Sequence, residues 1–60
     1  MDLMTTAEVA GYFRVDSSTV RRWRLDGLGP RFIKIGSVYR YPRPALDEWI
    51  ARRITERKVS

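Results

Sequence analysis

The sequence predicts a mainly α-helical fold with one small β-hairpin. Apolar side chains recur at helical spacing in three separate segments. Two short runs rich in β-branched and aromatic residues flank Gly36-Ser37, which is typical of a hairpin. Because a chain of 60 residues is short, we expect a single domain over residues 1–60, with its core at about residues 3–53 and a polar tail at 54–60.

The first helix is expected from Thr6 to Phe13. Thr5 and Glu8 have the spacing of a capping box, in which each side chain binds the backbone N–H of the other residue. Gly11 lies inside this helix, where glycine is less favourable than alanine by about 1 kcal/mol. We therefore expect a second helix to approach the first one closely at Gly11.

The second helix is expected between Asp16, as its N-cap, and Asp26, with Gly27 in the left-handed position after its end. Val20 and Trp23 share its inward face, where they are expected to pack in the core. The residues that point most nearly away from that face are Ser18, Arg21, Arg22 and Leu25. We expect the hairpin to cover Leu25, because helical spacing alone would leave this apolar side chain in water.

The hairpin is expected to have two antiparallel strands, at residues 32–35 and 38–41, joined by a type II′ turn at Gly36-Ser37. Pro42 then ends the second strand. The order helix, turn, helix, hairpin matches the plan of a winged helix-turn-helix, in which the hairpin is the wing.

A third helix is expected at about Ala45 to Arg53, with Pro44 at its opening. Asp47 and Glu48 would then lie near the positive end of its dipole. The predicted fold is therefore a winged helix-turn-helix with three helices and a two-stranded antiparallel wing.

Positive charge is concentrated in the middle of the chain. Twelve Lys and Arg stand against seven Asp and Glu, which gives a net charge of +5. Eight of the twelve basic residues lie between Arg14 and Arg43, where Asp16 and Asp26 are the only acidic ones. This balance favours a polyanionic partner such as nucleic acid.

Several classes of function lack the residues that they need. The sequence has no cysteine and no histidine, which removes thiolate metal sites and the commonest general base. Asp47 and Glu48 are adjacent and do not face each other on a helix, while Ser17 and Ser18 have no histidine to activate them. We therefore expect a non-enzyme that has no metal, cofactor or small-molecule ligand.

The location expected from the sequence is the cytoplasm. The first residues lack the basic and apolar regions of a secretory signal. No apolar run approaches the length of a membrane span. We therefore expect no membrane partner.

Several segments of the chain together match a pattern known from one family. They are Gly29-Pro30-Arg31-Phe32-Ile33-Lys34-Ile35-Gly36, which is the most specific, and Thr6-Ala7-Glu8-Val9-Ala10, Val15-Asp16-Ser17-Ser18-Thr19-Val20, Trp23-Arg24 and Tyr39-Arg40-Tyr41. Over about residues 3 to 53 the sequence thereby resembles the excisionase-like helix-turn-helix family, the small relatives of the MerR-type winged-helix DNA-binding domain. One departure is Arg43-Pro44-Ala45, where such domains often have Arg-Ser-Asp.

The resemblance implies that the chain binds double-stranded DNA. The candidate DNA-binding residues lie on the second helix and the wing: Ser17, Ser18, Thr19, Arg21, Arg22, Lys34, Ser37 and Arg40. The second helix would enter the major groove. On the wing, Lys34 would contact a phosphate and Arg40 would insert deepest into the minor groove.

Each candidate also has a purely structural interpretation. Arg21 and Arg22 could be solvated charges, Ser17 to Thr19 could serve the helix terminus, and the charges of the hairpin could protect a strand edge. For the whole chain, the resemblance implies a phage or prophage excisionase that binds repeats at an attachment site and bends the DNA. It would direct a cognate integrase toward excision and act with further copies of itself. The alternatives are a small AlpA-like transcriptional regulator and a basic protein-interaction module.

Overall fold

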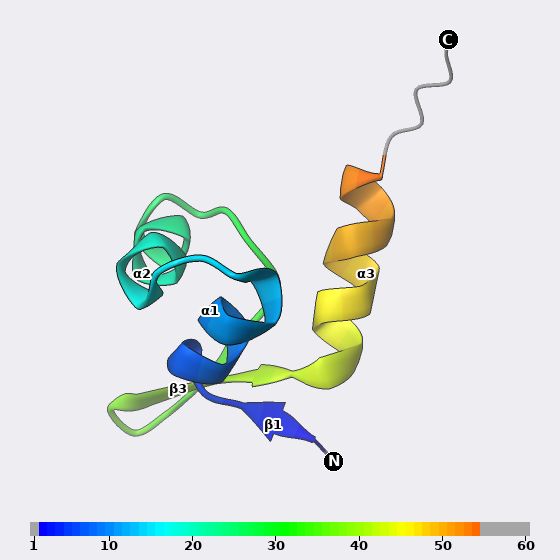
Figure 1. The fold of residues 1–60 in the computed structure, drawn as a ribbon. Coiled ribbons are helices and arrows are strands. Elements are labelled where there is room, and N and C mark those ends of the chain that lie inside the picture. Colours follow the sequence, from blue (N-terminus) through cyan, green and yellow to red (C-terminus); the bar gives the residue numbers. More distant parts are fainter. Residues whose placement is uncertain (1, 55–60) are drawn as a thin grey trace, which may run out of the picture.

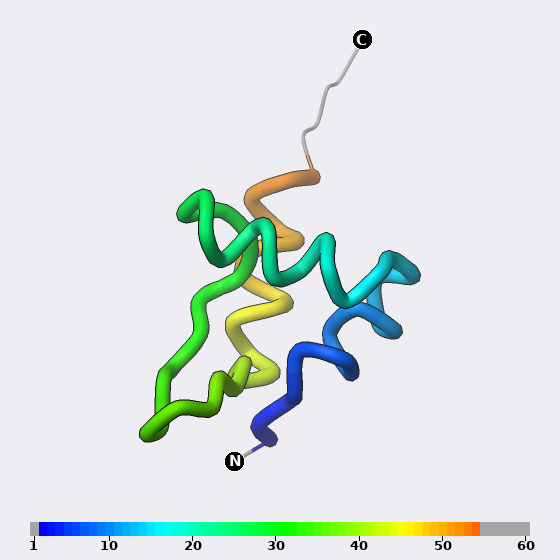
Figure 2. The backbone as a smooth tube through the Cα atoms, turned by 90° about the vertical axis from the view of Figure 1, so that its left-hand side faces the viewer, coloured from blue at the N-terminus to red at the C-terminus, as the bar shows by residue number. Residues whose placement is uncertain are grey.

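The computed structural model describes residues 2–54, whose elements form a winged helix-turn-helix. In chain order the elements are β1 (Leu3–Met4), α1 (Thr6–Phe13), α2 (Ser17–Leu25), β2 (Ile33–Ile35), β3 (Val38–Pro42) and α3 (Arg43–Arg53). A short turn joins α1 to α2, and α3 continues from β3 on the other side of the molecule (Figure 1). The β2–β3 hairpin projects beyond the helices at one end (Figure 2). Apart from Ile54, the expected polar tail lies outside the described residues.

The predicted helix α1 is confirmed, with the same bounds. Its capping box is complete, since Glu8 N–H donates to Thr5 Oγ1 at 3.0 Å and Thr5 N–H donates to Glu8 Oε1 at 2.9 Å. After the helix, Arg14 adopts a left-handed conformation with φ of 60°. The N–H of Val15 donates back to the carbonyl of Ala10 at 2.9 Å, which turns the chain toward α2.

The prediction that a second helix approaches α1 closely at Gly11 is wrong. A Cβ atom added at this position would meet nothing within 4 Å, and the residue is exposed. The contact between α1 and α2 is made by the opposite side of α1, where Val9 and Ala10 are buried.

Replacing Gly11 with alanine is therefore expected to stabilise the protein by about 1 kcal/mol, because alanine is the better helix former and has room. Urea unfolding followed by circular dichroism measures the difference. A variant that is less stable than the parent would contradict an open environment at Gly11.

The end of α2 follows the prediction. Gly27 has φ of 73°, and its N–H donates to the carbonyl of Arg24 at 3.3 Å. The N–H of Leu28 donates to the carbonyl of Trp23 at 2.7 Å, which completes a Schellman motif. At the other end, Asp16 is the N-cap by its backbone, but its side chain makes no capping hydrogen bond.

The sheet has three strands, whereas the sequence predicted a wing of two. β2 pairs with β3 as predicted, and Gly36 takes φ of 63° at the turn, the first central position of a type II′ turn. On the other edge of β3, β1 pairs antiparallel through Leu3 with Pro42 and Met4 with Tyr41. The two residues of β1 are too few to show a strand pattern in the sequence, and their partners in β3 lie far away along the chain.

Helix α3 begins two residues earlier than expected, at Arg43, with Pro42 as its N-cap and Pro44 in its first turn. No acidic residue therefore lies in the first turn, and the expected dipole role of Asp47 and Glu48 is wrong. The carboxylate of Glu48 instead forms ion pairs with Arg31 at 3.9 Å and with Arg52 at 3.6 Å.

The core lies where α1, α2, β3 and α3 meet. Its buried members are Val9, Ala10, Val20, Tyr41 and Leu46, with Met4, Phe13 and Trp23 packed against them. The ring centroid of Trp23 lies 5.1 Å from that of Trp49 and 5.9 Å from that of Phe13. Trp23 therefore faces inward as predicted and links α2 to α1 and α3. None of the helices within residues 2–54 has the length and apolar character of a membrane span.

Candidate nucleic-acid interface

The outer face of α2 presents two free guanidinium groups. Arg21 and Arg22 are exposed, and within residues 2–54 neither forms an ion pair with an acidic side chain. Ser18 is also exposed, and together with Thr19 and Arg22 it lines a shallow hollow of about 300 Å³. Ser17 and Thr19 are half-buried at the start of the helix. The structure thus brings the predicted residues of the second helix together on one accessible surface.

Arg24, the third arginine of α2, points inward, and sequence reasoning missed its role. Its Nη1 donates to Thr6 Oγ1 at 3.1 Å and to the Tyr41 hydroxyl at 3.2 Å. Its guanidinium carbon also lies 4.0 Å from the centroid of the Tyr39 ring. One side chain therefore ties α2 to the start of α1 and to the middle strand of the wing.

The sequence holds only a faint signal of this role. Helical spacing places Arg24 on the flank of α2, between the inward and the outward faces. Its partners lie 17 and 18 positions away along the chain, so no local pattern could identify them.

The two cations predicted to contact DNA from the hairpin, Lys34 and Arg40, lie on opposite faces of it. Lys34 pairs with Tyr39 and Ile33 pairs with Arg40, and successive side chains of a strand point to opposite faces. Lys34 therefore shares the face of Tyr39, which is turned toward Arg24 of α2, and its Nζ lies 5.8 Å from the Tyr39 ring centroid. The side chain of Arg40 lies on the other face, where it donates to the Tyr39 carbonyl at 2.8 Å.

Ser37 is exposed at the tip of the hairpin, as a contact with DNA would require. Lys34 lies on the side of the hairpin that is turned toward Arg24 of α2. The insertion of Arg40 into a minor groove stays a prediction, because the structure assigns its guanidinium a contact within its own strand.

The expected cover of Leu25 by the hairpin is wrong, since 84% of this residue is exposed. The Arg24 guanidinium stacks on the hairpin ring of Tyr39 and so occupies the space between α2 and the wing. Leu25, the next residue along the helix, consequently points to water on the outer side of α2.

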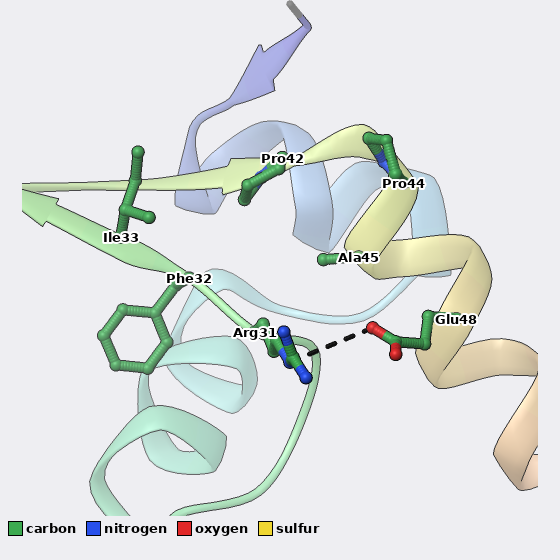
Figure 3. Close-up of a pocket in the computed structure, with 7 residues that line it drawn as sticks. All are labelled: Arg31, Phe32, Ile33, Pro42, Pro44, Ala45 and Glu48. Carbon is green, nitrogen blue, oxygen red and sulfur yellow. Dashed lines mark ion pairs between the residues drawn. The ribbon is translucent and has the colours of Figure 1, made fainter.

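Two further arginines of the basic segment contact α3 or α1 rather than lie free. Arg31 reaches Glu48 across a groove of about 690 Å³ that is lined mainly by apolar residues of β2, the end of β3 and the start of α3 (Figure 3). The guanidinium carbon of Arg43 lies 4.9 Å from the ring centroid of Tyr12. Arg43 thus contacts another element of the fold, whereas Arg31 keeps 76% of its side chain exposed beside its long ion pair.

The described residues contain no group of three acidic, histidine or cysteine side chains that could hold a metal ion. The outer face of α2 carries the cationic hydrogen-bond donors Arg21 and Arg22, and α2 follows α1 after a tight turn. Such a second helix, beside a projecting hairpin, defines a winged helix-turn-helix DNA-binding protein.

Comparison with known families agrees with this class. The model of a family described as a helix-turn-helix domain matches residues 3–54, and the chain belongs to this family of small DNA-binding domains. Membership supports sequence-specific binding to double-stranded DNA. No curated protein matches the chain.

Proposed function

We propose that the protein is a phage or prophage excisionase, a small DNA-binding protein that directs an integrase toward excision. The observation that carries the DNA-binding part is the outward pair Arg21 and Arg22 on α2, next to a wing whose Lys34 faces the same helix. The excision part rests on the Gly29 to Gly36 run and the other segments that resemble excisionase-like domains. In this proposal the chain acts in the cytoplasm on double-stranded DNA and catalyses no reaction itself.

The second helix would lie in the major groove. An arginine there can donate two hydrogen bonds to O6 and N7 of guanine, which distinguishes this base from the other three. The half-buried Ser17 and Thr19 lie at the helix N-terminus, where backbone N–H groups favour a phosphate. Lys34 and Ser37 would hold the sugar-phosphate backbone beside the groove, and Arg40 would follow the minor groove.

A single module of this size makes few contacts. One small DNA-binding domain buries only about 600–1,000 Å² of its surface on DNA, so one copy is expected to bind weakly. Several copies on adjacent repeats would together bind the DNA more tightly than one copy, and they would bend the DNA between them. A bent site would help a cognate integrase to assemble for excision, and the integrase would perform the strand exchange.

The DNA-binding part is tested by the salt dependence of binding to duplex DNA. If the bound chain neutralises about six phosphates, the logarithm of the association constant should fall with the logarithm of salt concentration with a slope of about −5. A flat dependence, or no binding to any duplex, would instead favour a basic protein-interaction module.

The excision part is tested by recombination in vitro with a cognate integrase. Addition of the protein should raise the yield of excision and lower that of integration. An unchanged excision yield, together with control of a nearby promoter, would favour an AlpA-like regulator, which would use the same surface.

Replacing Arg21 or Arg22 with alanine is expected to relax the preference for one base pair by about 1–3 kcal/mol, because a bidentate contact to guanine is lost. Binding to a full set of single-base variants of the preferred site measures this change. Arg52→Ala is the control, because Arg52 is exposed on α3 and pairs with Glu48. A loss that is uniform over all sites would make the replaced arginine a phosphate contact instead.

A further inference from the structure

One residue on the outer face of α2 remains without a role in the binding scheme above. Leu25 is 84% exposed, which is the largest value among the exposed large apolar residues within residues 2–54. Burying an apolar side chain is favourable by about 1.5–3 kcal/mol, so its exposure forgoes stability. The fold itself therefore makes little use of this leucine.

The position of Leu25 on α2 aligns it with the candidate DNA contacts. Ser18, Arg22 and Leu25 stand at i, i+4 and i+7, and Arg21 stands four residues before Leu25, so they share one face. At a rise of about 1.5 Å per residue, Leu25 lies about 10 Å from Ser18 along the axis. This distance equals about three base-pair steps of a DNA strand at about 3.4 Å each. A helix that presents Arg21 and Arg22 to base edges presents Leu25 to the same groove, about one helical turn further along.

The inward contacts of Arg24 leave Leu25 uncovered on the outer face of α2. Its guanidinium is held by Thr6, Tyr41 and the Tyr39 ring, and it therefore does not extend over Leu25 on the outer face. The residues that flank Leu25 on that face are the cations Arg21 and Arg22, which suit a phosphate-rich surface better than an apolar protein surface. The surroundings of Leu25 are thus those of a DNA contact.

The chemistry of the major groove leaves one fitting target. A leucine side chain has no hydrogen-bond donor or acceptor, and the C5-methyl group of thymine is the apolar group on the base edges there. We propose that Leu25 reads a thymine through its C5-methyl group, next to the base pair read by Arg21 or Arg22. This inference rests on the proposed binding of α2 in the major groove, and it adds a specificity-determining residue to that surface.

The test removes the methyl group from the DNA and the side chain from the protein. A preferred duplex is first selected from a random library with the full chain. Each thymine in it is then replaced singly by deoxyuracil, which lacks only the C5-methyl group. Binding of the parent chain should weaken about fourfold at one position, as expected for one buried methyl group, and stay unchanged at the others.

The Leu25→Ala variant should bind the thymine and the uracil duplexes equally at that position. Alanine favours the helix, so this exposed change keeps the fold, and thermal unfolding verifies it. Leu28→Ala is the matched control, because Leu28 is also an exposed leucine, at 57%, but lies beyond the end of α2. This control should keep the full sensitivity to the methyl group.

The outcomes separate this proposal from the one on which it rests. Salt-dependent duplex binding without any effect of uracil would overturn the role of Leu25 and leave the DNA-binding function standing. The same holds if Leu25→Ala retains the sensitivity of the parent chain. A failure to bind any duplex would overturn both proposals together.

Discussion

Replacing Arg24 with alanine is expected to lower the free energy of unfolding by about 3 kcal/mol. The change removes two hydrogen bonds from a charged donor and a stacking contact on the Tyr39 ring. It also leaves the hydroxyl of Tyr41, a residue that is only 1% exposed, without its partner. An unsatisfied buried hydroxyl alone costs about 1–3 kcal/mol.

Urea unfolding of the Arg24→Ala variant measures this loss. Arg22→Ala is the matched control, because Arg22 is an exposed arginine on the same helix and its removal should change stability by less than about 0.5 kcal/mol. Arg24→Lys should recover only a part of the loss, since lysine lacks the planar fork that bonds Thr6 and Tyr41 and stacks on the ring. Equal stabilities of the Arg22 and Arg24 variants would show that the inward contacts contribute nothing.

The Arg24 variants also bear on DNA binding. Since Arg24 links α2 to the wing, its loss should free the hairpin to move relative to the helix. Lys34 would then be less well placed for its phosphate, and the salt dependence should become less steep by about one unit. Measurement at a temperature where the variant remains folded separates this effect from unfolding.

Replacing Gly29 with alanine is expected to destabilise the protein by about 3 kcal/mol. Gly29 has φ of 86°, and a left-handed conformation costs a residue with a side chain about 1–2 kcal/mol. The new Cβ atom would also lie 3.0 Å from Trp23 Cβ and 3.1 Å from Trp23 Cε3. Relief of such overpacking requires a shift that typically costs about 1–3 kcal/mol.

Gly27→Ala isolates the backbone part of this cost. Gly27 has a similar φ of 73°, but a Cβ atom there meets nothing within 4 Å. Its replacement should therefore cost only about 1–2 kcal/mol. The difference between the two variants, read from urea unfolding, measures the contact of Gly29 with Trp23, and two equal losses would rule that contact out as a source of destabilisation.

The elements that follow local rules were predicted closely. Helix α1 has the expected bounds because a capping box forms between residues three apart. Helix α2 ends at Leu25, and Gly27 follows Asp26 in the predicted left-handed conformation. The hairpin turn at Gly36 likewise needs only its own backbone preference. The start of α3 was misplaced by two residues, since Arg43 joins the helix while Pro42 still pairs with β1.

The candidate site was predicted in part for the same reason. Periodicity identified Arg21 and Arg22 as outward residues of α2, and the structure shows both exposed. The opposite faces of Lys34 and Arg40 follow from the register of the hairpin, which the position of the turn already implied. The contacts of Arg24 and the exposure of Leu25 depend on how the wing packs against α2, and no short-range pattern encodes that packing.

The sequence by itself thus determined the capping box of α1, the left-handed turn after α2, the hairpin turn and the outward face of α2, because each depends on residues within about one or two helical turns. Only the tertiary structure decided that β1 joins the sheet, that Gly11 lies in open space and that Gly29 lies against Trp23. It also decided that Arg24 bonds to α1 and β3, whereas Arg21 and Arg22 are exposed on the outer face of α2. The physical reason is that burial and pairing are set by contacts between distant segments, which form only when the whole chain has folded.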